Sequence, residues 1–97
     1  MKSLDELKRI TYDSIVQEYN EALEKEQTKL EDLNLEKFRY ILLLDIGAIE
    51  ETSIINKKDI DAFMNKFPSK ESEIKREIRK YEALLCNLED IKRHYVK

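Results

Sequence analysis

Phe38-Arg-Tyr-Ile-Leu-Leu-Leu-Asp-Ile-Gly-Ala-Ile49 decides the expected fold, because this stretch is apolar on nearly every side of a helix. A helix without a polar face must be enclosed by other elements rather than lie on a surface. The stretch is too short to span a bilayer, which requires about 20 apolar residues. It is therefore predicted to form the central helix of a small bundle.

The composition of the chain favours an all-α protein. With 97 residues, the chain is long enough to form one domain, residues 1–97, with its own hydrophobic core. It contains one Gly, one Pro and 40% charged residues, whereas an all-β chain of this length needs many more turn residues. A single helical domain is expected.

The sequence predicts a cytoplasmic protein without a membrane segment. Cys86 is the single cysteine and cannot form an intrachain disulfide, which favours a reducing compartment. The first residues lack the apolar core of a secretory signal. The high content of Lys, Ile and Asn is compatible with an AT-rich genome. A phage or mobile-element origin would fit a small, acidic inhibitor rich in Lys and Ile.

A first long helix is predicted over residues 3–33. Ser3, followed three residues later by Glu6, matches the pattern of a capping box. Seven positions spaced alternately by four and three form a heptad seam, which indicates packing against another helix. These positions are Tyr12, Val16, Tyr19, Leu23, Glu26, Leu30 and Leu33.

The first ten residues do not continue this seam. Leu4, Leu7 and Ile10 form a separate apolar stripe, rotated away from the main one. This change of face has two explanations: a break or bend near Thr11, which folds a terminal turn onto the bundle, or a contact surface for a second chain.

Two shorter helices are predicted next, over residues 35–51 and 57–66. Asn34 is a suitable N-cap for the second helix, whose own seam runs from Leu35 and Phe38 towards Ile49. Gly47 is compatible with an early end or with a close approach of two helices, but the helix-forming residues after it favour continuation to Glu51. Asn56 caps the third helix.

The third helix is expected to end before Pro68, because the residue preceding a proline avoids the α region. A last long helix is predicted over residues 70–96. Its seam keeps heptad spacing through Ile74, Ile78, Tyr81, Leu85, Leu88, Lys92 and Tyr95. The two short helices laid end to end match one long helix in length, so the prediction is a four-helix bundle.

Three charged residues occupy seam positions where apolar residues are expected: Glu26, Asp45 and Lys92. A buried unpaired charge costs several kcal/mol, so each must be paired, extended to solvent or exposed. Three roles are compatible with these residues: they specify the register of the helix packing, they recognise a partner, or they form an acid–base site. The last role requires the three side chains to converge on one pocket.

The sequence predicts no catalytic residue, cofactor or metal. His94 is the only histidine and Cys86 the only cysteine, too few for a zinc site. On one helix these two residues would lie roughly 12 Å apart, too far for a nucleophile–base pair.

The leading functional hypothesis is a small non-catalytic interaction protein: an adaptor, a subunit or an inhibitor of a larger protein. The first third of the chain is acidic and the last third mildly basic, so the two are expected to complement each other within the fold. A homodimer is also compatible with the long seams. The predicted partner-binding residues are the stripe and the acidic positions of the first helix: Leu4, Leu7, Ile10, Asp13, Glu21, Glu24 and Glu31.

The alternative hypothesis is a regulator that binds nucleic acid. Basic residues related by helical spacing form a stripe on the last helix, and such a stripe can follow phosphates. These residues are Lys75, Arg76, Arg79 and Lys80. Glutamates interrupt the stripe and the pI is about 5.3, so nucleic acid is the less favoured partner.

Overall fold

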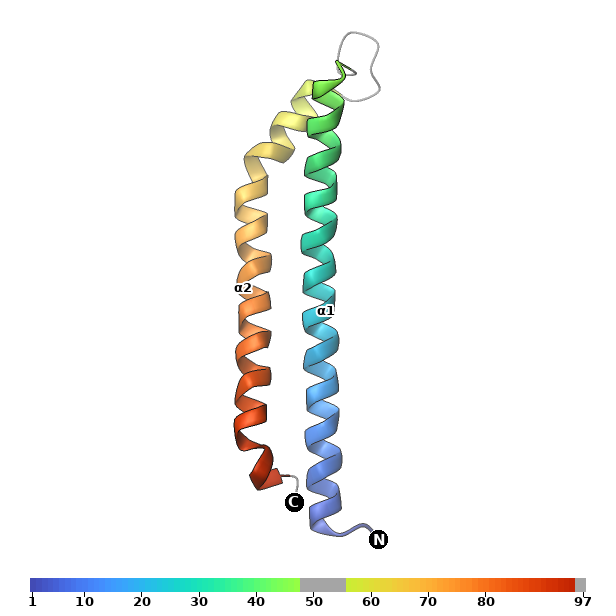
Figure 1. Cartoon of the computed structure of the whole chain (residues 1–97), viewed down its shortest axis with the longest axis vertical. Helices are drawn as coiled ribbons and strands as arrows, with labels where there is room; N and C mark the ends of the chain where they lie inside the picture. Colours follow the sequence, from blue (N-terminus) through green and yellow to red (C-terminus); the bar gives the residue numbers. More distant parts are fainter. Residues whose placement is uncertain (48–55, 96–97) are drawn as a thin grey trace.

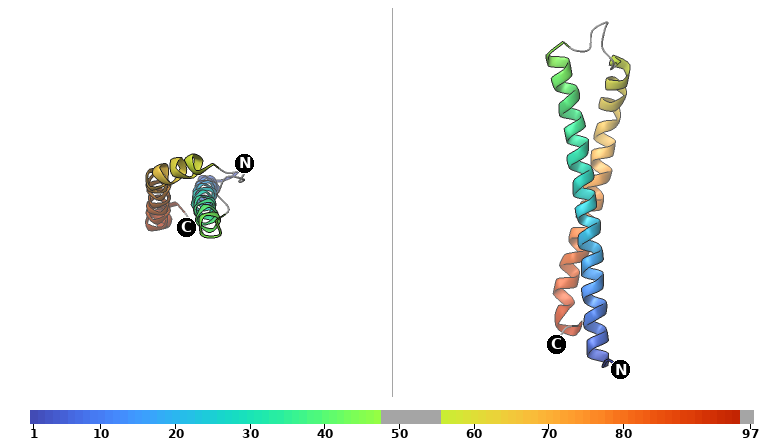
Figure 2. Two further views of the ribbon diagram at one scale, coloured as in Figure 1. Left: turned by 90° about the horizontal axis from the view of Figure 1, so that it is seen from above. Right: turned by 90° about the vertical axis from the view of Figure 1, so that its right-hand side faces the viewer.

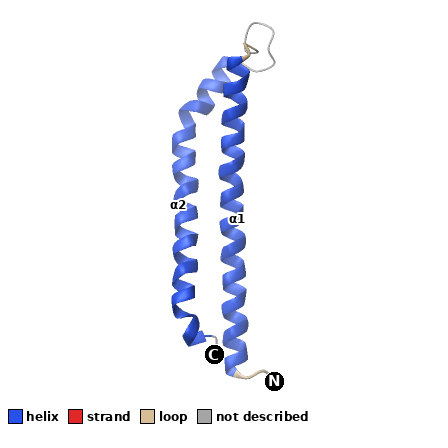
Figure 3. Cartoon of the chain, in the orientation of Figure 1, coloured by secondary structure: helices blue, strands red, loops and turns tan. Residues whose placement is uncertain are grey.

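The chain forms a helical hairpin rather than a four-helix bundle (Figure 1). The computed structural model describes residues 1–47 and 56–95. In it, α1 (Leu4–Asp45) and α2 (Lys57–Tyr95) lie side by side and antiparallel, with both termini at one end. We call that end the base and the opposite end the tip. The described residues contain no strand (Figure 3), so the all-α prediction is confirmed and the four-helix prediction is wrong.

The hairpin is long and thin. Its principal extents are 70 × 22 × 16 Å. Its radius of gyration is 21.2 Å, whereas a compact chain of this length has about 12.5 Å. Two helices have no third layer to close over them, and the elongated shape follows from that.

The predicted boundary between the helices over 3–33 and 35–51 does not exist. Asn34, expected as an N-cap, lies inside α1, and its side-chain amide donates a hydrogen bond to the Leu30 carbonyl (3.0 Å). An asparagine inside a helix costs less than about 0.7 kcal/mol, and neither Gly nor Pro occurs between residues 4 and 46. Nothing in this segment is therefore strong enough to stop the helix.

Both ends of α1 have a clear local cause. The start at Ser3 is confirmed, because its Oγ accepts a hydrogen bond from the Glu6 N–H (3.2 Å). The helix ends at Asp45, since Gly47 adopts a left-handed φ of 70° and donates its N–H to the Leu44 carbonyl. The helix was expected to continue to Glu51, and that prediction is wrong because α1 ends at Asp45. Residues 48–51 lie outside the described part of the chain.

α2 also runs through a predicted break. The expected helices over 57–66 and 70–96 are one helix, and Pro68 lies inside it. Proline has no N–H to donate to the carbonyl of Met64, and such a position kinks a helix rather than ending it. The first turns of α2 accordingly lean across towards α1 (Figures 1 and 2). The predicted cap at Asn56 is confirmed, because its side-chain oxygen accepts the Lys58 N–H (3.0 Å).

Aromatic residues hold the two helices together along their length. The ring centroids of Tyr19 and Tyr81 are 6.0 Å apart near the middle, and those of Tyr40 and Phe63 are 5.0 Å apart near the tip. Tyr19 and Tyr81 belong to the predicted seams of the two long helices, so these seams face each other. Only four hydrophobic residues of the described chain are buried: Tyr12, Leu33, Ile60 and Phe67.

The core at the base depends on a hydrogen bond between helices. The Tyr12 hydroxyl donates to the Leu88 carbonyl at 2.8 Å. We expect Tyr12→Phe to lower the free energy of unfolding by about 1 kcal/mol, because only the hydroxyl is lost. Tyr19→Phe is the matched control, since that hydroxyl has no hydrogen bond within the described residues, and it should change little. Urea unfolding followed by circular dichroism measures both, and equal effects would contradict the role of this bond.

The apolar stretch is not enclosed over its described part, residues 38–47, contrary to the prediction. α2 covers one side, where Tyr40, Ile41 and Leu43 are half-buried. On the other side, Phe38 and Leu42 each keep 60% of their surface exposed. One neighbouring helix cannot cover every side of another, so the hairpin leaves part of this stretch in water.

Candidate interaction surface

The side of α1 turned away from α2 carries the most unusual residues of the molecule. Positions separated by multiples of seven keep the same direction relative to a heptad seam. Leu7, Leu35 and Leu42 share one such position, and Ile10 and Phe38 share another, both opposite the seam that faces α2. We call this side the outer face; it normally carries polar residues in a solvated helix.

The outer face is apolar at both ends of α1. Near the base it carries the N-terminal stripe, defined as Leu4, Leu7 and Ile10, and all three side chains are exposed. Near the tip it carries the tip stripe, whose members are exposed by 60–66%. The tip stripe consists of Leu35, Phe38, Leu42 and Ile46.

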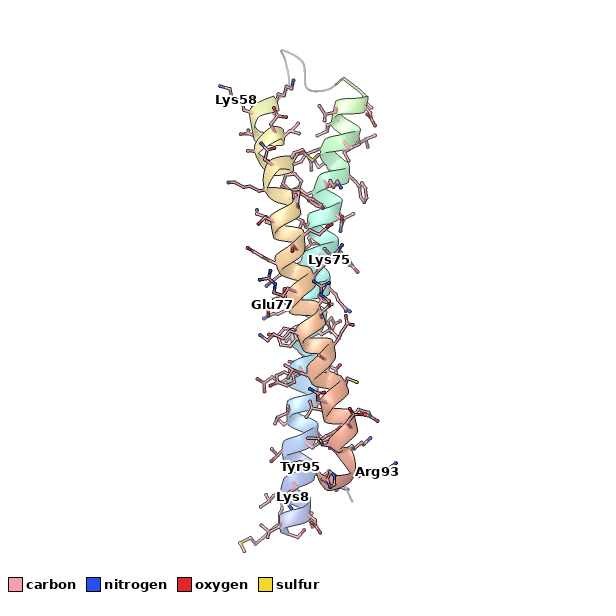
Figure 4. All side chains as sticks on the ribbon, turned by 90° about the vertical axis from the view of Figure 1, so that its left-hand side faces the viewer. Lys8, Lys58, Lys75, Glu77, Arg93 and Tyr95 are labelled. Carbon is pink, nitrogen blue, oxygen red and sulfur yellow. The ribbon has the colours of Figure 1, made fainter. Side chains whose placement is uncertain are left out.

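The helix neither breaks nor bends onto a bundle at the N-terminal stripe. Thr11 lies within α1, and its hydroxyl donates to the Leu7 carbonyl at 2.9 Å. The explanation by a terminal turn that folds onto the bundle is therefore wrong. Figure 4 shows Lys8 of α1 together with Arg93 and Tyr95 of α2 at the base of the hairpin.

An acidic band separates the two stripes. Glu21, Glu24 and Glu31 are exposed on the outer face. Glu21 and Glu24 line a shallow depression whose other charged residues are Glu18, Asp32, Lys25 and Lys29. Asp13 is exposed but lies next to the seam, where it lines a depression with Lys92 and Glu89 of α2. The predicted partner-binding residues other than Asp13 thus share one side of α1, spread over about 40 Å of its length.

The three charged seam residues do not converge. Glu26 is half-buried and accepts a hydrogen bond from Lys29 Nζ at 2.8 Å. Asp45 ends α1, roughly 28 Å further along the helix axis, while Lys92 lies near Tyr12 at the base. The acid–base site proposed for these residues is therefore wrong.

The Lys29 ammonium, which contacts Glu26, has a shifted pKa. Its hydrogen bond to Glu26 and the attraction of that carboxylate raise the pKa above 10.5, with smaller contributions from Tyr81 and Glu77. A group whose pKa is raised on folding stabilises the folded state at pH values below its pKa in the unfolded chain. That contribution disappears as the pH rises through the raised pKa of the folded state. It is therefore fully present at neutral pH.

The basic stripe of α2 is partly neutralised by its own helix. Lys75 lies 3.4 Å from Glu71, and Lys80 lies 3.3 Å from Glu77. Arg76 and Arg79 are exposed, without an ion pair to any described residue. The ion pairs of the described chain each join two residues of the same helix, so the predicted pairing of an acidic first helix with a basic last helix is not seen.

The remaining chemistry-bearing residues form no site. Cys86 is exposed on α2 rather than packed, and His94 lies in the last turn of α2 beside Lys92 and Arg93. Within residues 1–47 and 56–95, no three His, Cys, Asp or Glu side chains are grouped to hold a metal ion.

Comparison with protein-family models, with curated proteins and with solved structures finds no match for this chain. Neither described helix combines the length and the apolarity that crossing a membrane requires.

The tip stripe was not predicted to be a surface. Leu35, Phe38 and Leu42 were expected in the inner seam of a separate helix, because the apolar phase changes after Leu33. The change of phase is real, but it marks a second seam on the opposite side of one continuous helix. The spacing of 28 residues from Leu7 to Leu35, four heptads, was the available signal.

Proposed function

We propose that the hairpin is a non-catalytic interaction protein, an adaptor, subunit or inhibitor, which binds a larger protein in the cytoplasm through the outer face of α1. The exposed N-terminal stripe next to the acidic band supports this proposal. Apolar side chains exposed in a row at one end of a surface are typical of a binding site, whereas singly scattered ones are not.

The chemistry of this surface defines its partner. The N-terminal stripe fits an apolar groove, and Glu21, Glu24 and Glu31 fit a basic surface about 15–35 Å further along. Attraction between opposite charges would speed association and weaken as salt is added. Pairing of Lys75 and Lys80 with glutamates disfavours the nucleic-acid alternative, since paired cations are less available to phosphates.

Affinity capture from cells that express the protein tests the proposal with matched variants. The wild type and Arg76→Glu/Arg79→Glu should retain the same protein partner. Leu7→Glu/Ile10→Glu should bind it at least tenfold more weakly, because two apolar contacts are lost. Glu21→Lys/Glu24→Lys should weaken binding and reverse its salt dependence.

The controls separate the two candidate functions. A captured ligand that disappears with Arg76→Glu/Arg79→Glu and with nuclease treatment, but not with Leu7→Glu/Ile10→Glu, would overturn the proposal and favour nucleic acid. Circular dichroism must show the same helicity for every variant, because an unfolded variant says nothing about the surface.

A further inference from the structure

We draw no further inference here: the strongest candidate, the tip stripe on the outer face of α1, is an unpartnered apolar face flanked by exposed Arg39 and Asp45, and nothing in the described part of the chain shows what covers it.

Discussion

Replacement of Phe67 by Ala should lower the free energy of unfolding by about 3–5 kcal/mol. Phe67 is buried between the helices, where its ring centroid is 6.0 Å from that of Phe63 and 4.4 Å from the Lys37 Nζ. Its removal leaves a cavity beside Pro68, where α2 is already kinked and cannot easily close the gap. Urea unfolding followed by far-ultraviolet circular dichroism measures the change.

Phe67→Leu is the matched control for this prediction. Leucine keeps most of the apolar volume but loses the aromatic contacts, so the expected loss is about 1–1.5 kcal/mol. All variants are compared at the same protein concentration. An Ala variant no less stable than the Leu variant would show that Phe67 is not packed as described.

Ile60→Ala should destabilise the tip by about 2–5 kcal/mol. Ile60 is the most deeply buried residue of the described chain, with 1% of its surface exposed. It lies in the first turn of α2, so its loss should release that end of the helix before the base unfolds. Amide hydrogen exchange measures this directly, and residues 57–67 should exchange faster while the amides around Tyr12 and Leu88 change little.

Ile60→Val supplies the control, with an expected loss of about 0.5–1.5 kcal/mol because one methylene is removed. Uniformly faster exchange in Ile60→Ala, at both the tip and the base, would contradict local release and show that the hairpin unfolds as one unit. Unchanged exchange throughout would show that Ile60 carries no packing energy.

Part of the candidate surface was readable from residue spacing. Leu4, Leu7 and Ile10 depart from the seam that begins at Tyr12, and that departure predicted a separate face. The structure places this face in solvent. Spacing alone did not show that these residues share a face with Glu21, Glu24 and Glu31. A break or bend near Thr11 was one of the two explanations considered, and it would have turned the first ten residues in a different direction.

The sequence by itself determined that the chain is helical and where its local signals act. Ser3 and Asn56 shape helix starts through their own side-chain hydrogen bonds, and such short-range effects are encoded within a few residues. Gly47 was recognised as a possible helix end, but continuation through it to Glu51 was favoured, and its left-handed φ was seen only in the structure. The heptad seams likewise follow from local periodicity, so the faces that meet between α1 and α2 were predictable.

Only the tertiary structure decided how many helices there are. Asn34 and Pro68 are weak or ambiguous stops, and whether a helix continues through them depends on the packing gained on either side. Leu33 and Phe67, each directly before one of these residues, are buried between the helices, so continuation is favoured. The same decision turned the apolar segment around Leu42 from a predicted core helix into an exposed surface, because one long partner helix covers only one side of it.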